Sequence, residues 1–241
     1  MIEVEQRDRV TLITLDRPEK RNALDTQACD DLAAAAVDAV DGGTRAVVIA
    51  GNGKAFCSGA DLRTVEDDAF VPRLYRALDV IRTLPVATIA AVQGAALGGG
   101  TQLAIACDLR VVAPDARFGI PAAKLGLMVN HWTVQRLALL AGPGAASSVL
   151  LACEEIDAES ALRSGLANRA GGLDNALAWA EEISKLAPLT IAGHKVALNS
   201  LDAPNENAEV LAAFRAAWAS ADLAEGQRAR NEKRPPVFEG R

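Results

Sequence analysis

The sequence predicts an α/β protein built on a largely parallel sheet. Three short apolar runs, at residues 46–50, 86–92 and 109–113, are bounded by polar residues or by glycine. Continuous apolar runs of this length are typical of strands buried on both faces of a parallel sheet. Stretches with helical spacing separate the runs, and half of the 241 residues are apolar. The chain is therefore long and apolar enough to bury a large core.

The remaining elements follow in chain order. A strand pair is expected at residues 2–5 and 10–15. A helix is expected between Asp25 and Gly42, because Ala28, Leu32 and Val40 recur at helical spacing before the two glycines. After about residue 130 strand signals nearly vanish, and we expect an α/β core followed by a helical C-terminal part. Those later helices are predicted at residues 131–141, 143–153, 157–164, 174–186, 190–200 and 205–221.

The last of these helices carries an apolar stripe. Val210, Leu211, Phe214 and Trp218 fall on one side of it. Such a stripe favours core packing or a subunit contact over a cofactor site.

Charge and cysteine content exclude several protein classes. The net charge of −6 argues against a general nucleic-acid binder. The acidity is uneven, since residues 225–241 hold five Lys/Arg against three Glu and form a basic tail on an acidic body. The four Cys and two His have no metal-ligand spacing, so we expect no metal site and a reduced, cytoplasmic location.

Residues 83–107 are an uncharged stretch long enough to span a bilayer. Pro85, Gln93 and several glycines interrupt it, so we interpret it as buried core and expect no membrane span. The first ten residues show no signal-peptide pattern.

Two glycine-rich turns, at residues 51–62 and 93–103, each follow an apolar strand and precede a helix. Glycine lets the backbone approach a ligand closely, and a helix N-terminus offers unpaired N–H groups. The second turn has Gly100 where a P-loop needs its lysine, and neither turn matches GxGxxG. If both turns aim at one point they form an oxyanion hole for a carbonyl group; the alternative is a pair of tight structural turns.

At these residues the sequence resembles the crotonase (enoyl-CoA hydratase/isomerase) superfamily. The second turn lies in the longest match, IAAVQGAALGGGTQLAIACDL at residues 89–109. Shorter matches are DRPEKRNAL at 16–24, KAFCSGADL at 54–62, AESALRSGL at 158–166 and EKRPPVF at 232–238. They occur in the order that the family shows.

The resemblance implies a spiral of ββα units over residues 1–190, which bind acyl-CoA. A C-terminal helical segment, residues 191–241, would close over CoA and build a homotrimer or a hexamer. The backbone N–H groups of Ser58 and Gly99 would hold the thioester oxygen. Other residues implied to bind CoA or its acyl chain are Lys20, Arg21, Ala23, Ala60, Asp61, Leu62 and Lys233. No further cofactor is implied.

The two glutamates that a hydratase of this family uses are missing. The first belongs directly after GGG-x, where this chain has Gln102, and the second after FGxP, where it has Ala122. An amide cannot act as a carboxylate base, and losing one general acid/base costs about 10²–10⁴-fold in rate. His131 is a candidate substitute acid/base. Asn130 and Trp132 are expected to shape the acyl pocket, with Asn130 capping the next helix.

These observations predict an acyl-CoA-binding protein of fatty-acid metabolism, with a partner protein of that metabolism, that retains the oxyanion hole but lacks ordinary hydratase activity. One alternative is isomerisation or thioester hydrolysis with His131, or a carboxylate among Glu66, Asp67 and Asp68, as base. Another is a non-catalytic carrier or scaffold, and a nicotinamide-dependent oxidoreductase is more distant. His194 is expected at the surface, and Cys57 is expected to be a packing residue.

Overall fold

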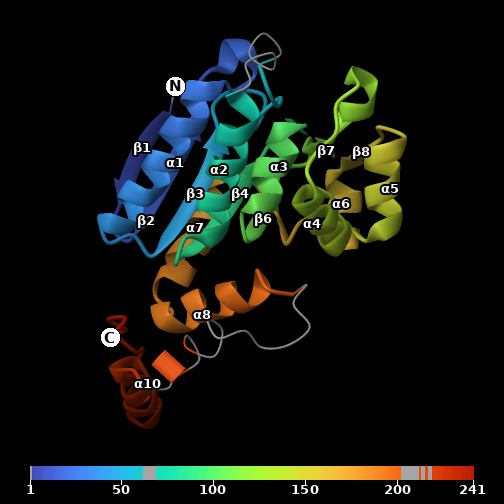
Figure 1. The fold of residues 1–241 in the computed structure, drawn as a ribbon. Coiled ribbons are helices and arrows are strands. Elements are labelled where there is room, and N and C mark those ends of the chain that lie inside the picture. The colour runs from blue at the N-terminus through green and yellow to red at the C-terminus, as the bar shows by residue number, and fades with distance from the viewer. Residues whose placement is uncertain (1, 62–68, 202–211, 213–214, 217–218) are drawn as a thin grey trace.

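Two sheets form the frame of the computed structural model, which describes residues 2–61, 69–201, 212, 215–216 and 219–241 (Figure 1). The larger sheet has the order β1-β2-β3-β4-β6-β9, and the smaller has the order β5-β7-β8. The strands are β1 (Ile2–Arg7), β2 (Val10–Leu15), β3 (Ala46–Gly51), β4 (Ala87–Val92), β5 (Ala95–Leu97), β6 (Leu109–Val112), β7 (Arg117–Gly119), β8 (Glu155–Asp157) and β9 (Arg169–Ala170).

Helices cover both faces of the larger sheet. They are η1 (Pro18–Lys20), α1 (Thr26–Asp41), α2 (Phe70–Thr83), α3 (Gly99–Ala106), η2 (Pro121–Leu125), α4 (His131–Ala141), α5 (Pro143–Leu151), α6 (Ala158–Ser164), α7 (Leu173–Ser184), α8 (Pro188–Leu198) and α10 (Ala221–Glu232). In Figure 1, α1 and α2 lie on one face of the sheet and α7 lies behind it.

Strand β3 shows why the central strands are apolar throughout. It pairs in parallel with β2 and β4, and all six of its residues are buried. Val47 and Ile49 pack into the core under α1 and α2, while Val48 packs against α7. Because successive side chains point to opposite faces, a strand covered on both faces favours apolar residues at every position. The predicted parallel α/β sheet is confirmed.

The strands of the smaller sheet add a second strand to the βα units, which become ββα units. Chain leaving β4 forms β5 before entering α3, and chain leaving β6 forms β7. Strand β5 pairs in parallel with β7 and is also bridged to Cys57, beyond β3. The implied spiral of ββα units is therefore confirmed, and its smaller sheet aligns the two glycine-rich turns side by side.

The predicted elements agree with the structure over most of the described chain. The predicted strands and helices up to residue 200 are present, with ends shifted by a few residues. A helix was expected after the first glycine-rich turn, but the bounds of α2 were not predicted, although Phe70, Leu74, Leu78 and Ile81 form its buried stripe. The short strands β5, β7, β8 and β9 were also not predicted, because so short a run has no readable period. Helix α10 has no counterpart among the individually predicted helices, but it lies within the C-terminal segment 191–241 that was predicted to be helical. The stripe Val210, Leu211, Phe214 and Trp218 lies outside the described residues.

The uncharged stretch at residues 83–107 spans the end of α2, β4, β5 and α3, and most of it is buried. This confirms the interpretation as core. Within the described ranges, no helix combines the length and the hydropathy that crossing a bilayer requires.

Two buried cations hold the end of α3 in place. Arg110 donates to the backbone carbonyls of Ala104 (3.2 Å), Cys107 (2.8 Å) and Asp108 (3.1 Å). Burial lowers the pKa of its guanidinium to about 10. Lys195 of α8 pairs with Asp108 at 2.8 Å. The Arg110 contacts satisfy carbonyl groups that a helix end leaves without intrahelical partners.

Candidate functional site

The two glycine-rich turns are in backbone-to-backbone contact. A Cβ on Gly100 would lie 2.1 Å from the carbonyl oxygen of Cys57, and one on Gly59 would lie 2.7 Å from that of Leu97. Gly94 has a φ of +54°, and a Cβ there would lie 2.0 Å from the carbonyl oxygen of Lys54. Real Cβ contacts are never this short, so these positions require glycine. The turns therefore have a fixed mutual position.

The N–H groups of the turns differ in whether they are paired. The Cys57 N–H donates to the carbonyl of Ala95 at 3.0 Å, and the Ser58 N–H donates to that of Arg21 at 2.9 Å. Gly99 is the first residue of α3, and no described residue accepts from its N–H. An unpaired N–H at a helix N-terminus is a favourable site for an anionic or polarised oxygen.

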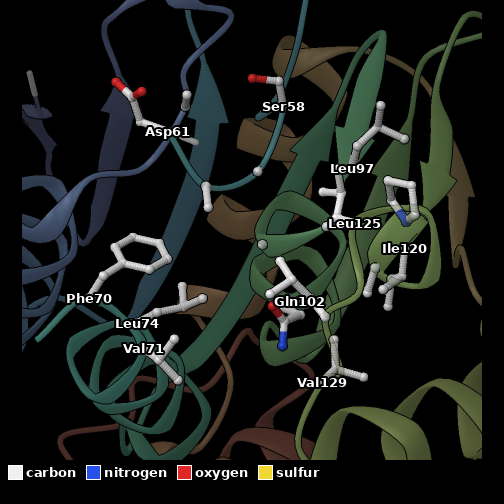
Figure 2. Close-up of a pocket in the computed structure, with 18 of the residues that line it drawn as sticks. Ser58, Asp61, Phe70, Val71, Leu74, Leu97, Gln102, Ile120, Leu125 and Val129 are labelled. Carbon is white, nitrogen blue, oxygen red and sulfur yellow. The ribbon is translucent and has the colours of Figure 1, made fainter. Parts of the chain in front are cut away.

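Beside the turns lies a cavity of about 530 Å³. Figure 2 shows Ser58 and Asp61 at one end of it and Gln102 and Val129 at the other. One wall comes from α2, through Phe70, Val71, Leu74 and Tyr75. The facing wall comes from β5 and the segment around η2, through Leu97, Ile120, Leu125 and Met128. The cavity is apolar over most of its surface, as expected of a site for an aliphatic chain.

Ion pairs close the polar end of the cavity. Asp61 pairs with Lys20 at 3.1 Å and with Arg17 at 3.6 Å, and Arg17 also pairs with Asp25 at 2.7 Å. Among the described residues that line the cavity, Asp61 supplies the one carboxylate. The Asp61 carboxylate is therefore engaged by two cations.

A neutral amide lies at the other end. Gln102 of α3 is buried, lines the cavity, and donates from Nε2 to Thr133 Oγ1 at 2.8 Å. The side chain of Ala122 also lines the cavity and adds no polar group.

The structure brings most of the predicted site residues together. Those that line the cavity are Lys20, Ala23, Ser58, Ala60, Asp61, Gly99, Gln102 and Ala122. Arg21 is exposed and reaches the site through its carbonyl oxygen only. Leu62, Glu66, Asp67 and Asp68 lie outside the described residues.

His131 is not among the described residues that line the cavity, and its acid/base role stays an untested prediction. The buried stripe of α4 is Thr133, Leu137 and Ala141, and His131 stands on the opposite side and is exposed. Asn130 and Trp132 also do not line the cavity. Asn130 caps α4, as predicted, by accepting from the Thr133 N–H at 3.0 Å. Trp132 borders two smaller surface hollows instead.

The basic tail packs on its own helix. Asp222 accepts from the N–H groups of Glu239 and Gly240 at 2.7 and 2.8 Å. Arg234 donates to Glu225 and lowers the pKa of that carboxyl to about 2. Lys233 is exposed just beyond α10, which lies beside α8 and away from α3 (Figure 1). Lys233 therefore does not reach the cavity of its own chain.

The residues that sequence reasoning missed are the apolar walls. The helical period of α2 was a readable signal for Phe70 and Leu74. The segment 120–129 has no period, because η2 and an extended stretch alternate in it. Its role depends on the smaller sheet, which directs the chain after β7 across the cavity.

Among the described residues, no feature of this site supports catalysis by a cysteine nucleophile or by a metal ion. Burial raises the pKa of the Cys57 thiol to about 12, which suppresses its thiolate and confirms it as a packing residue. Over the described ranges, no three His, Cys, Asp or Glu residues gather in a metal-binding group. His194 is exposed, as predicted.

Comparisons with known proteins agree with this geometry. Residues 5–241 match the family described as enoyl-CoA hydratase/isomerase. The chain is 46% identical over its whole length to all of a Mycobacterium tuberculosis protein named "Probable enoyl-CoA hydratase echA6". It is 35% identical over 99% of its length to 98% of the 2,3-dehydroadipyl-CoA hydratase of Escherichia coli.

The solved structures give the same result. An enoyl-CoA hydratase from Polaromonas sp. JS666 superposes with a TM-score of 0.90 at 30% identity, with 99% of both chains covered. An enoyl-CoA hydratase from Mycobacterium tuberculosis superposes with a TM-score of 0.87 at 32% identity, over 100% of this chain and 99% of that one. This chain belongs to the enoyl-CoA hydratase/isomerase family.

Proposed function

We propose that this chain binds acyl-CoA thioesters in the cavity beside the glycine-rich turns and is not an ordinary hydratase. The observation that carries the proposal is the composition of the cavity. It has an unpaired helix N-terminal N–H at Gly99, an apolar interior, and Gln102 and Ala122 at the positions that resemble those of the family's two glutamates. Relatives that are named as hydratases of CoA thioesters, an enoyl-CoA hydratase and a 2,3-dehydroadipyl-CoA hydratase, support the thioester as ligand.

The thioester oxygen is proposed to accept from the Gly99 and Ser58 N–H groups. The two turns are held together tightly, which preorganises these donors. The Ser58 N–H already donates to the Arg21 carbonyl at 2.9 Å. The oxygen must therefore share this donor or displace Arg21, whereas the Gly99 N–H needs no such exchange. Gly99 is the principal donor in this proposal.

The missing base is the reason to expect little or no hydration. Adding water to an enoyl group requires one group to take a proton from water and one to deliver a proton to carbon. Gln102 is neutral, and Ala122 has no polar group. Asp61, paired with Lys20 and Arg17, lies at the opposite end of the cavity from Gln102 (Figure 2).

A non-catalytic carrier of acyl-CoA is the second candidate. The pairing of Asp61 favours it, because the described part of the cavity then holds no free carboxylate for isomerisation or thioester hydrolysis either. A carrier of this kind would act in cytoplasmic fatty-acid metabolism and pass its ligand to a partner protein.

The CoA moiety is proposed to leave the cavity past Lys20, Ala23 and Ala60, with its phosphates near Lys20 and Arg21. Lys233 lies away from this path within its own chain, so a contribution from Lys233 requires a neighbouring copy. We propose a homotrimer or hexamer, with residues 191–241 as the segment that mediates assembly and closes over CoA.

Removing a single N–H tests the thioester site. Gly99→Pro deletes the donor at the first helical position, where proline is tolerated. Gly99→Ala is the matched control, because it adds a Cβ whose nearest neighbours lie at 3.7 Å and keeps the N–H. Equilibrium binding is measured with hexanoyl-CoA and with its thioether analogue, S-hexyl-CoA, which lacks the carbonyl.

The wild type and Gly99→Ala are expected to favour the thioester by about 2- to 12-fold, as for one hydrogen bond. Gly99→Pro is expected to lose this preference. Equal binding of both ligands by the wild type would remove the oxyanion-hole assignment, and no binding of either would overturn the whole proposal.

Hydration of crotonyl-CoA tests the catalytic part separately. At high protein concentration the rate is expected to lie at least about 100-fold below that of an active family hydratase assayed alongside. Turnover comparable to that enzyme would contradict the non-hydratase proposal while leaving thioester binding intact.

A further inference from the structure

A second, smaller hollow lies between α4 and the end of α8, and it is called the α4–α8 hollow here. Its volume is about 250 Å³. None of the described residues that line it also lines the larger cavity, so the two are separate places on the molecule. The side chains that matter below come from one stripe of α4 and from the residues at and after the end of α8: Trp132, Arg136, Leu139, Leu198, Asn199 and Leu201.

Arg136 supplies a guanidinium group with unused donors. Its Nε donates to the carbonyl oxygen of Ile105 in α3 at 3.1 Å, and this bond fixes the orientation of the planar group. No described residue accepts from Nη1 or Nη2, and neither atom is among the sealed polar atoms without a partner. Both Nη groups are therefore accessible to a ligand. An arginine held in this way is preorganised to donate two parallel hydrogen bonds to a carboxylate.

Two guanidinium groups packed under α4 form no ion pair with a described residue. Arg110 is held by neutral carbonyl groups, and Arg136 donates to one such group. The nearby carboxylate of Asp108 is paired with Lys195 at 2.8 Å. After burial, repulsion from Arg136 is the next cause that lowers the pKa of Arg110, and burial lowers the pKa of Arg136 as well. The region carries uncompensated positive charge, which a bound anion would neutralise.

Apolar side chains surround the open end of Arg136. Leu139, Leu198 and Leu201 are each more than half exposed, and Trp132 is half-buried. Exposed leucines that gather around one hollow are typical of a binding surface, whereas scattered ones are not. An inorganic anion would leave these side chains in water, but an anion with an alkyl chain would cover them. The volume is below the roughly 300–1,000 Å³ of sites for drug-sized ligands, which indicates a small ligand.

We propose that the α4–α8 hollow binds medium-chain fatty acid anions, with the carboxylate on Arg136 and the alkyl chain against Trp132 and the three leucines. A thioester has no charge and gains nothing from the unused Nη groups, so this hollow selects the free acid. The inference does not depend on thioester binding in the larger cavity, since the two sites share no described lining residue.

Calorimetric titration with octanoate, hexanoate and 1-octanol tests the ligand class. Octanoate is expected to bind with a Kd below about 1 mM. Hexanoate is expected to bind up to about 15-fold more weakly, because it buries two fewer methylene groups. 1-Octanol has the chain without the charge and is expected to bind at least about 10-fold more weakly than octanoate. Binding of 1-octanol as tight as that of octanoate would overturn the carboxylate contact.

Leu139→Glu and Leu139→Gln locate the site, because they have similar shape and differ in charge. Leu139 is exposed and lies three residues after Arg136 on α4, so the new carboxylate would stand beside the guanidinium. Leu139→Glu is expected to bind octanoate at least about 5-fold more weakly than Leu139→Gln. Leu151→Glu, at an exposed position of α5 outside the hollow, is expected to bind it like the wild type. Equal affinity in the two Leu139 variants would place octanoate elsewhere and overturn the inference.

Arg136→Gln provides an independent variant, with its folding checked by urea denaturation. It is expected to bind octanoate and 1-octanol equally, and a retained preference for octanoate would overturn the role of Arg136. Absence of octanoate binding, together with loss of self-association in Leu139→Glu on size-exclusion chromatography, would assign the hollow to a subunit contact and also overturn the inference.

Binding of hexanoyl-CoA distinguishes this inference from the proposed function. Its affinity is expected to be the same in Leu139→Glu and Leu139→Gln, and a difference would contradict the separation of the two sites. If no variant and not even the wild type binds hexanoyl-CoA, the proposed function fails, while the octanoate titrations still decide the inference drawn here.

Discussion

The two walls of the cavity are built on different principles. One side is formed by the glycine-rich turns and is called the glycine wall here: Gly59 lines the cavity, Gly94 and Gly100 lie behind it, and none of the three leaves space for a Cβ. On the other, Leu125 is 51% and Met128 is 87% exposed. The first wall holds the N–H donor and the second presents apolar side chains that contact little else.

The two walls therefore have different roles. The glycine wall fixes the position of the proposed thioester-binding N–H group, and the exposed apolar wall is expected to affect which acyl chain is preferred. The glycine wall cannot shift without breaking the contact between two ββα units, so the location of the Gly99 N–H is fixed by the fold. The exposed apolar wall contributes little to stability, because its side chains remain in water in the free protein. Substitutions there can alter ligand preference without unfolding the chain.

The largest expected effect comes from adding one methyl group to the glycine wall. Gly100→Ala would place its Cβ 2.1 Å from the Cys57 carbonyl oxygen, and both backbones would have to move. We expect a loss of about 3 kcal/mol in the free energy of unfolding, measured by urea denaturation. Gly144→Ala is the matched control, since nothing lies within 4 Å of its Cβ. A Gly100→Ala variant as stable as Gly144→Ala would show that the wall is not rigid.

The next effect is a pH dependence of stability that arises from buried thiols. Burial raises the pKa of Cys29, Cys57 and Cys107 to about 12, so these thiols stay protonated when folded. Above pH 9 the unfolded chain loses these protons and the folded chain does not. The free energy of unfolding therefore falls as pH rises from about 9 to 12, by up to about 1.4 kcal/mol per pH unit for each thiol.

Urea denaturation between pH 8 and 10.5 checks this, with Cys57→Ala expected to flatten the decline. Val111→Ala is the control, because it truncates a buried core residue without removing a titrating group. Identical pH slopes in both variants would mean that Cys57 is not held protonated by the glycine wall.

The smallest effect concerns the exposed wall. Met128→Ala is expected to leave the free energy of unfolding unchanged within about 0.5 kcal/mol. It is expected to weaken binding of long acyl-CoA chains by up to about 1 kcal/mol, because the bound chain would cover this side chain. Short-chain binding is expected to stay the same. Calorimetric titration with butanoyl- and dodecanoyl-CoA measures both, and a stability loss comparable to that of Gly100→Ala would refute the contrast between the walls.

Much of the fold could be predicted from local pattern. The runs at 46–50, 86–92 and 109–113 predicted central strands correctly, because burial on both faces leaves a largely apolar signature, which only Thr88 and Arg110 interrupt. The glycine-rich turns and the substitutions Gln102 and Ala122 were also visible in the sequence. The bounds of helix α2 were missed although its period was readable, and β5, β7, β8 and β9 were missed because two or three residues carry no period.

The sequence by itself determined the α/β class, the family and which residue types stand at the family's site positions, since these depend on pattern and on local spacing. Only the tertiary structure decided which residues meet. His131 faces away from the cavity because the buried residues of α4 set how the helix is oriented about its axis. The tertiary structure also fixed the direction of the Gln102 amide through Thr133, which is 31 residues away in sequence. Hydrogen-bond direction is a property of the whole network, and no single position in the sequence encodes it.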